Sequence, residues 1–273
     1  MTIVERWSRR CLLPTLLLGR QLARAASSSE DATCANVFSL RPGPADPSAA
    51  GEKTLLLVRH AEGWHNKDAR ELPNWKADAL GLTMKYWDAR LTPEGERQCA
   101  ALAASLARAA PPDLVAASPL TRTLQTATLT FGAAYGAGPA AGGPPFLATE
   151  LARERIAAHT CDGRRSRAEQ AAEFAHVDFS ELESDEDALF HSAKEDEPTE
   201  FASERCFARA GELLAWLHGR PEQRIAVVSH WVFLRHLLTR FAADASLQEN
   251  FGNAEMREVA LVPTNRTACY AGS

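Results

Sequence analysis

The sequence predicts an α/β fold with a mainly parallel sheet, and two observations lead to this prediction. Short apolar runs that suit buried strands alternate along the chain with longer segments in which apolar residues recur at helical spacing. The apolar runs at residues 54–60 and 224–230 both end in a histidine. Alternating strands and helices form parallel sheets, which bind ligands at the carboxyl ends of their strands.

Composition limits the range of functions. The 273 residues can form one substantial domain, or one domain with a tail. An apolar content of 45% and a charged content of 24% are ordinary for a globular protein, and the net charge of −5 gives no reason to expect a nucleic-acid partner. The apolar stretch at residues 11–19 is too short to cross a bilayer, so no membrane span is expected. Nothing in the sequence indicates an oligomeric state.

Residues 1–50 differ in composition from the rest and are expected to form a tail and linker. Arginines outnumber acids strongly before residue 30, and serines occupy residues 27–29. This composition is typical of a transit peptide for a chloroplast or mitochondrion; a secretory signal, or an unstructured tail on a cytoplasmic protein, is the alternative. Prolines at residues 41–47 predict a linker. The folded domain is placed at residues 51–265, with a C-terminal tail at residues 266–273.

The first elements of the domain are predicted from local signals. An apolar run that ends in Arg59 and His60 predicts a buried strand over residues 54–60. Residues 67–90 have no clean period and are expected to form a long loop with some helix. A helix over residues 92–110 follows, because Thr92 can cap it and a proline suits its first position.

The remaining elements alternate, with one interruption. Residues 152–198 contain basic and acidic runs without a readable period. We expect them to form an insertion that covers a sheet edge, as a lid or a specificity element. Strands are predicted at residues 113–118, 146–151, 224–229 and 257–262, and helices at residues 120–126, 200–218 and 232–241.

Side chains that suit a phosphoryl group follow the predicted strands. Arg59 and His60 follow the first strand, and Arg122, Glu154 and His230 follow later ones. Because the carboxyl ends of parallel strands converge, we expect these side chains to lie together. Guanidinium groups bind phosphate oxygens, a neutral imidazole is a competent nucleophile, and a carboxylate can deliver a proton to a leaving oxygen.

Four sequence blocks follow one another in a recognisable order. They are Leu57-Val58-Arg59-His60-Ala61-Glu62 with Asn66, Leu91-Thr92-Pro93-Glu94-Gly95, Ser118-Pro119-Leu120 with Arg122-Thr123 and Gln125-Thr126-Ala127, and Val227-Val228-Ser229-His230. In this order they resemble the histidine phosphatase superfamily, in its phosphoglycerate mutase-like branch, over roughly residues 53–262. Residues 150–166 are similar to the plant phosphoglycerate mutase-like proteins in particular.

The resemblance implies both a fold and an activity. The fold would be a three-layer α/β/α sandwich with a mainly parallel, mixed sheet. The activity would be that of a metal-independent phosphatase, without a cofactor, that hydrolyses a small phosphorylated substrate. His60 would attack phosphorus and form a phosphohistidine, while Glu154 would donate and then accept the proton. The phosphoryl group would be held by Arg59, Asn66, Arg122 and His230.

The chain departs from the family pattern at three places. Ala61 replaces the usual glycine after the nucleophile. The bulky Trp231 follows the second histidine and is expected to narrow or reshape the pocket. Leu151 and Glu154 are one residue further apart than in the family pattern, so Glu150 is the alternative acid.

Two other functions are kept as alternatives. One is a phosphoglycerate mutase-type phosphotransferase, although nothing clearly matches the paired arginines with which true mutases grip the glycerate carboxylate. The other is a non-catalytic module for phosphorylated ligands, which would not need a nucleophile. Arginines 153, 155, 164 and 165 are expected either to contact a second anionic group or to form a solvated basic face. His65 and His159 are expected to structure loops, with a zinc site that includes His60 as the alternative.

Overall fold

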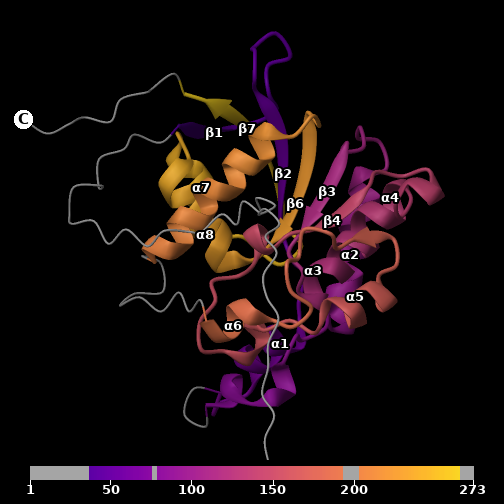
Figure 1. The fold of residues 1–273 in the computed structure, drawn as a ribbon, viewed down its shortest axis with the longest axis vertical. Helices are drawn as coiled ribbons and strands as arrows, with labels where there is room; N and C mark the ends of the chain where they lie inside the picture. The colour runs from indigo at the N-terminus through magenta and orange to yellow at the C-terminus, as the bar shows by residue number, and fades with distance from the viewer. Residues whose placement is uncertain (1–36, 76–78, 193–202, 265–273) are drawn as a thin grey trace, which may run out of the picture. The chain divides into compact units, whose positions relative to one another are not determined.

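The centre of the fold is a mixed β-sheet, seen in the computed structural model, which describes residues 37–75, 79–192 and 203–264 (Figure 1). Within these residues the strand order is β1-β7-β2-β6-β3-β4-β5. Along the part of the sheet ordered β2-β6-β3-β4-β5, neighbouring strands are parallel, and β7 runs antiparallel to both β1 and β2. The predicted fold class is confirmed. The strands are β1 (Phe38–Pro42), β2 (Lys53–Arg59), β3 (Leu114–Ala117), β4 (Phe146–Ala148), β5 (Val177–Asp178), β6 (Arg224–Ser229) and β7 (Met256–Pro263).

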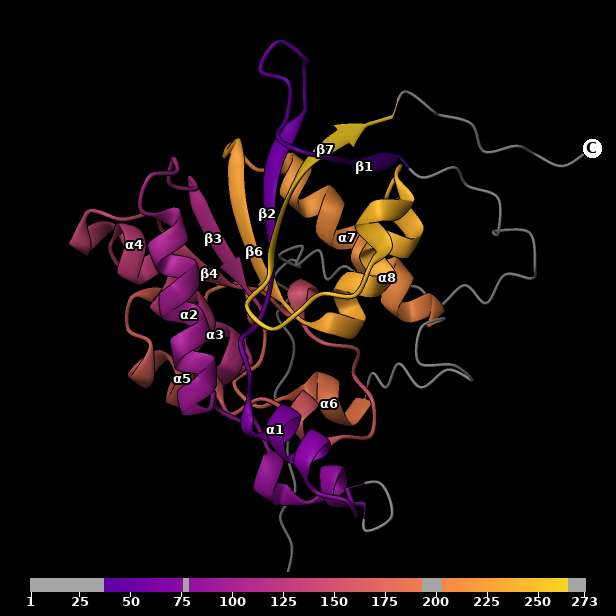
Figure 2. The same cartoon turned by 180° about the vertical axis from the view of Figure 1, so that it is seen from behind.

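Helices cover both faces of the sheet, which gives the predicted three layers (Figures 1 and 2). Successive side chains of β2 point to opposite faces. Leu55 and Leu57 pack in one apolar cluster with α7 (Glu204–Gly219) and α8 (Trp231–Phe241). Leu56 and Val58 pack in another with α2 (Pro93–Leu106), α3 (Thr121–Ala127) and α5 (Arg167–Glu173). A strand buried on both faces is continuously apolar, which explains why β2 could be predicted from the sequence.

Helix α2 holds the loop that follows β2. The predicted cap is present, because the Thr92 hydroxyl accepts a hydrogen bond from the Gly95 backbone at 3.0 Å. The Thr92 backbone also donates to the Glu62 carbonyl at 2.9 Å. A side chain at Gly95 would collide with that same carbonyl, so the close approach requires glycine. The helix ends at Leu106, four residues before the predicted end.

The domain begins earlier than the sequence indicated. β1 pairs with β7 at the edge of the sheet, with Arg41 opposite Ala260 and Pro42 opposite Val259. The linker prediction was wrong for these residues, because proline is tolerated at the end of an edge strand, where its missing N–H costs no ladder bond. The predicted transit peptide up to residue 36 and the C-terminal tail at residues 266–273 lie outside the described residues.

The other helices lie near the ends of the strands or extend α3. α1 (Trp64–Glu71) and α6 (Ala188–Ser192) lie at the end of the sheet where β2 ends, as both views show (Figures 1 and 2). A π-helical turn over Thr128–Gly132 continues α3 into α4 (Ala133–Tyr135). In the described ranges, no helix combines the length and apolarity that crossing a lipid bilayer would need.

The predicted insertion is partly integrated into the fold. Its residues up to 192 supply α5, α6 and the edge strand β5, which pairs with β4. Its arginines at 153 and 164 are buried, so neither a solvated basic face nor a free anion-binding pair describes them. Arg153 makes a bidentate ion pair with Asp187 at 2.7 and 2.8 Å, and Arg164 pairs with Glu150 at 2.8 Å. Residues 193–198 lie outside the described residues.

Breaking this ion pair should destabilise the domain strongly. Arg153→Met leaves the buried Asp187 without its bidentate partner, and an uncompensated buried charge costs about 3–5 kcal/mol in the free energy of unfolding. Urea unfolding followed by circular dichroism measures this loss. The double variant Arg153→Met/Asp187→Leu should recover much of it. Arg97→Met, which removes an exposed pair with Glu94, is the control and should cost about 1 kcal/mol or less. Equal losses for Arg153→Met and the control would contradict the prediction.

Candidate active site

Strands β2 and β6 bring the two candidate histidines to the same end of the sheet. The two strands are parallel neighbours, and Arg59 lies opposite Ser229. His60 and His230 follow directly, and the His60 backbone donates to the Ser229 carbonyl at 2.9 Å. The two imidazole centres are 5.0 Å apart, and both side chains are buried. Strand register alone therefore places two titratable rings side by side.

The hydrogen bonds of His60 define which ring nitrogen carries a lone pair. Its Nδ1 lies 2.7 Å from the Ala61 carbonyl, which can only accept, so Nδ1 carries the hydrogen. Nε2 then accepts from the Arg122 Nε–H at 3.3 Å. Burial and, next, the Arg122 charge hold the pKa of His60 well below its usual range. The imidazole is thus neutral, with its Nε2 lone pair directed at a guanidinium group.

Arg122 is positioned by the short helix α3 that follows β3. Its side chain is almost fully buried, and its Nη1 donates to the Cys161 carbonyl at 2.5 Å. Ser118, at the end of β3, lies with its hydroxyl 2.8 Å from Nε2 of His230. β3 is the next strand beyond β6, so three consecutive strands in the sheet supply this part of the site.

Arg59 is held between a carbonyl and an indole. Its Nη1 donates to the Phe251 carbonyl at 2.7 Å, and its Nε is buried with no hydrogen-bond partner among the described residues. The guanidinium carbon lies 5.8 Å from the centre of the Trp231 ring, within the range of a cation–π contact. Trp231 thus packs beside Arg59.

The Glu154 carboxylate lies at the N-terminus of α8. It accepts hydrogen bonds from the backbone of Phe233 at 2.9 Å and, less closely, from Val232 at 3.4 Å. Burial and, next, the charge of Asp162 raise the pKa of Glu154. Since His230 is the residue before α8, one helix start brings the candidate acid and the second histidine together.

Glu150, the alternative acid, is engaged elsewhere. Its two oxygens pair with Arg164 at 2.8 Å and with Arg153 at 3.1 Å. Both arginines are buried, so the carboxylate of Glu150 balances their charge. Because both oxygens of Glu150 are already held by these arginines, Glu154 is the better candidate for the proton donor.

Asn66 is not joined to the other candidates. Its Oδ1 accepts a hydrogen bond from the Gly63 backbone at 3.1 Å, which caps the start of α1. Among the described residues, no hydrogen bond links Asn66 to the two histidines, the two arginines or Glu154. Direct contacts therefore join His60 to Arg122 and to His230. The charge of Arg59 acts on His60, and the charge of Glu154 acts on Arg59. The hydrogen bond of Asn66 supports the helix beside them.

Two further residues lie at the site without having been predicted there. His65 is buried with its ring centre 5.7 Å from that of His60. Asp162 is buried with its Oδ1 3.9 Å from Nη2 of Arg122. Only Asp162 could have been found from sequence, because it belongs to the block that is similar to the plant proteins. The place of His65 depends on how α1 starts, which its neighbours in sequence do not reveal.

The buried histidines should make the fold acid-sensitive. Burial and, next, the charge of Arg122 lower the pKa of His60, His65 and His230 well below the usual value. Below about pH 6.5 the unfolded chain therefore binds protons that the folded chain does not, and stability falls as pH falls. Each histidine contributes about 1.4 kcal/mol per pH unit, partly offset by Glu154 and Asp162, whose pKa values are raised.

Urea unfolding at pH 7.5 and pH 5.5 measures this dependence. The free energy of unfolding should be lower at pH 5.5, and His65→Phe should reduce the slope by about one proton. An unchanged free energy between the two pH values would contradict the prediction.

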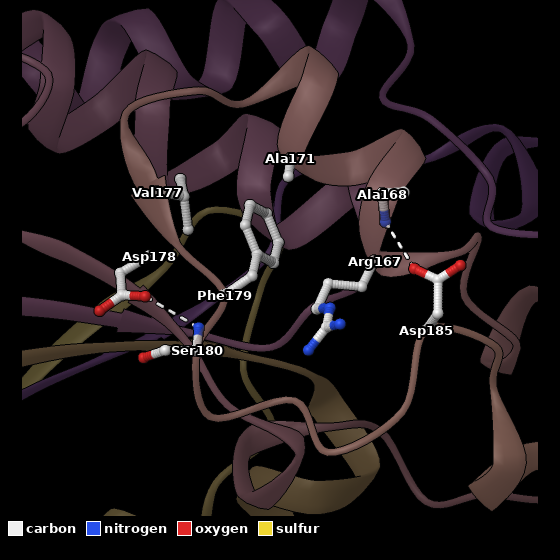
Figure 3. Close-up of a pocket in the computed structure, with 8 residues that line it drawn as sticks. All are labelled: Arg167, Ala168, Ala171, Val177, Asp178, Phe179, Ser180 and Asp185. Carbon is white, nitrogen blue, oxygen red and sulfur yellow. Dashed lines mark hydrogen bonds between the residues drawn. The ribbon is translucent and has the colours of Figure 1, made fainter.

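A separate pocket of about 380 Å³ lies on the insertion (Figure 3). Val177 and Phe179 form an apolar part of its wall, and Arg167 and Asp185 contribute charged groups. None of the six predicted site residues lines it. Among the described residues, no group of three or more histidines, cysteines or carboxylates is arranged to hold a metal ion.

Comparison with known proteins identifies the family. The sequence model of the histidine phosphatase superfamily (branch 1) matches residues 55–136. A "Phosphoglycerate mutase-like protein" of Arabidopsis thaliana is 36% identical over 241 residues, which cover 77% of this chain and 84% of that protein. "Phosphoglycerate mutase-like protein 1" of the same plant is 33% identical, with 77% and 81% covered. A solved phosphoglycerate mutase from Bacillus anthracis str. Sterne has a TM-score of 0.48 at 15% identity, with 77% of this chain and 88% of that chain covered. The chain belongs to the histidine phosphatase superfamily, in its phosphoglycerate mutase-like branch.

Proposed function

We propose that this protein hydrolyses a phosphomonoester through a phosphohistidine formed on His60. The observation that carries the proposal is the state of the His60 ring. Its Nδ1 is tied to the Ala61 carbonyl, and its neutral Nε2 lies beside the Arg122 guanidinium. A nucleophile that already faces a cationic group is suited to attack an anionic phosphoryl group.

The first step transfers the phosphoryl group to the enzyme. The Nε2 lone pair of His60 forms a bond to phosphorus as the bond from phosphorus to the leaving oxygen breaks. Glu154 gives its proton to that oxygen, and its raised pKa keeps a larger fraction protonated near neutral pH. Arg59 and Arg122 neutralise the charge on the equatorial oxygens, and His230 donates a hydrogen bond to one of them.

The second step returns the enzyme to its starting state. The Glu154 carboxylate takes a proton from water as the water oxygen attacks phosphorus. The bond between phosphorus and His60 Nε2 breaks, and inorganic phosphate leaves. Because the basic side chains supply the charge that stabilises phosphoryl transfer, we propose that the reaction needs no metal ion or cofactor.

Phosphotransfer between two positions of phosphoglycerate is the second candidate. Mutases need cationic groups for the substrate carboxylate, and three arginines of the insertion are engaged in ion pairs. Arg153 pairs with Asp187, Arg164 pairs with Glu150, and Arg165 pairs with Asp88 and Glu173. This favours hydrolysis over transfer.

Assays with 3-phosphoglycerate and with an aryl phosphate separate the candidates. Release of free phosphate from the aryl compound, without formation of 2-phosphoglycerate, supports hydrolysis. Interconversion of the two phosphoglycerates that depends on a bisphosphate primer supports a mutase. Binding of phosphate without turnover of either substrate would support a non-catalytic module. A panel of sugar phosphates, phosphoglycerates, inositol phosphates, nucleotides and phosphopeptides would then identify the substrate class.

The basic N-terminal segment is proposed to direct the protein to a chloroplast or mitochondrion. The support is its arginine-rich, acid-poor composition. A fluorescent fusion that carries residues 1–50 alone should enter the organelle. A diffuse cytoplasmic signal from that fusion would contradict the proposal.

A further inference from the structure

His65 is the buried titratable group at the site that the reaction above does not use. It is the second residue of α1, and its side chain is nine-tenths buried. A side chain at Gly63 would come within 2.9 Å of the His65 ring, so glycine leaves the space into which the ring folds. The ring centre lies 5.7 Å from that of His60, whose other neighbour, His230, is at 5.0 Å. His60 thus has two imidazole neighbours, His65 on α1 and His230 at the start of α8.

The two neighbours of His60 both have a buried ring nitrogen that lacks a partner. Nε2 of His230 is held by the Ser118 hydroxyl at 2.8 Å, while its Nδ1 has no hydrogen-bond partner among the described residues. The Nδ1 of His65 is buried and has no hydrogen-bond partner among the described residues. A buried polar nitrogen without a partner costs free energy, and its presence in a site indicates that a ligand supplies the partner.

The surroundings define the chemistry of that ligand. After burial, the charges of Arg122 and then Arg59 have the largest effects on the pKa of His65, and both lower it. A neutral imidazole close to two guanidinium groups can donate one hydrogen bond to an anionic oxygen. A phosphorus atom in position for attack lies about 3–3.5 Å from Nε2 of His60, and its oxygens extend toward the side chains around that ring.

We propose that His65 is a third imidazole of the site, and that it donates a hydrogen bond to an oxygen of the phosphoryl group. This inference rests on the proposed function, since it uses the phosphoryl position set by His60. It assigns to His65 a contact with the phosphoryl group. The neighbouring Asn66 instead caps the start of α1.

Affinity for inorganic phosphate, measured by calorimetry, tests the contact without turnover. His65→Phe keeps a planar ring and removes the donor, while His65→Asn keeps an amide donor near the position of Nδ1. Loss of a hydrogen bond to a charged oxygen should weaken phosphate binding by about 10- to 100-fold in His65→Phe and much less in His65→Asn. The inhibition constant of phosphate for aryl phosphate hydrolysis should change in parallel. His218→Ala, on α7 beside Phe38, is the matched histidine control.

The outcomes separate this inference from the proposed function. If His65→Phe is folded and active and binds phosphate as tightly as the native protein, His65 makes no such contact and hydrolysis through His60 still stands. If the native protein hydrolyses no phosphomonoester, yet binds phosphate in a manner that depends on His65, the contact stands and the proposed function fails. Weakening in His65→Phe that His65→Asn restores supports the contact directly.

Discussion

Replacing His60 with asparagine should abolish phosphomonoester hydrolysis. Asparagine can keep a hydrogen bond like the one from Nδ1 to the Ala61 carbonyl, but it has no nucleophilic nitrogen. Loss of a nucleophile should lower kcat for an aryl phosphate by on the order of 10⁴- to 10⁶-fold. The size of this effect follows from the mechanism, because both steps pass through the bond between phosphorus and Nε2.

Rapid quenching of the native enzyme should reveal the intermediate. Phosphorus bound to His60 should appear within one turnover as an acid-labile modification of the peptide that contains His60, detected by mass spectrometry. His218→Ala should keep the native rate, because His218 packs beside Phe38 on a different part of the sheet. Native and His60→Asn proteins that hydrolyse the substrate equally fast would refute the assignment of the nucleophile.

Replacing Glu154 with glutamine should have an effect that depends on the leaving group. An alkyl phosphate needs a proton on its leaving oxygen, so its turnover should fall by about 10²–10⁴-fold. The phenolate of an aryl phosphate leaves without being protonated, so the first step should remain fast with that substrate. The second step should be slow for both, because glutamine cannot take a proton from water. The expected result is a burst of one equivalent of phenol, accompanied by accumulation of one equivalent of phosphohistidine.

The pH dependence of the first step provides a second test of the role of Glu154. Glu154 acts as an acid in the first step, so transfer from an alkyl phosphate should slow as pH rises through its raised pKa. That descending limb should be absent in Glu154→Gln. Glu150→Gln is the matched control, and it should lower stability through its partners Arg153 and Arg164 without changing the dependence on the leaving group. The leaving-group pattern in Glu150→Gln instead would transfer the acid role to that residue.

Much of the sheet could be predicted because its strands carry strong local signals. β2 and β6 are buried on both faces and therefore read as continuous apolar runs that end at a histidine. β1 could not be predicted, since its pairing with β7 joins segments far apart in the chain and its composition resembles a linker. A local sequence pattern identifies an element only where burial requires a run or a regular spacing of apolar residues.

The candidate site residues that directly follow strands could be predicted from the sequence. Arg59, His60 and His230 follow from strand ends that converge, and Arg122 from the helix after the next strand. Two features depend on tertiary contacts that no spacing encodes. Glu154 is held by the backbone of α8, and His65 is brought to His60 by the turn into α1. The burial of Arg153 and Arg164 was missed for the same reason, because Asp187 and Glu150 lie 34 and 14 residues away from them in the chain.

The ion pairs of the insertion define a unit for protein engineering. Glu150, Arg153, Arg164 and Asp187 bind one another, and the Arg164 guanidinium also donates to carbonyls of residues 184–186. Both ends of every one of these bonds lie between residues 150 and 187. A chimera that exchanges this whole block with a relative keeps these four charges and their ion pairs together. A shorter graft separates them, so the spacing of these four charges sets the smallest segment that can be exchanged with these ion pairs intact.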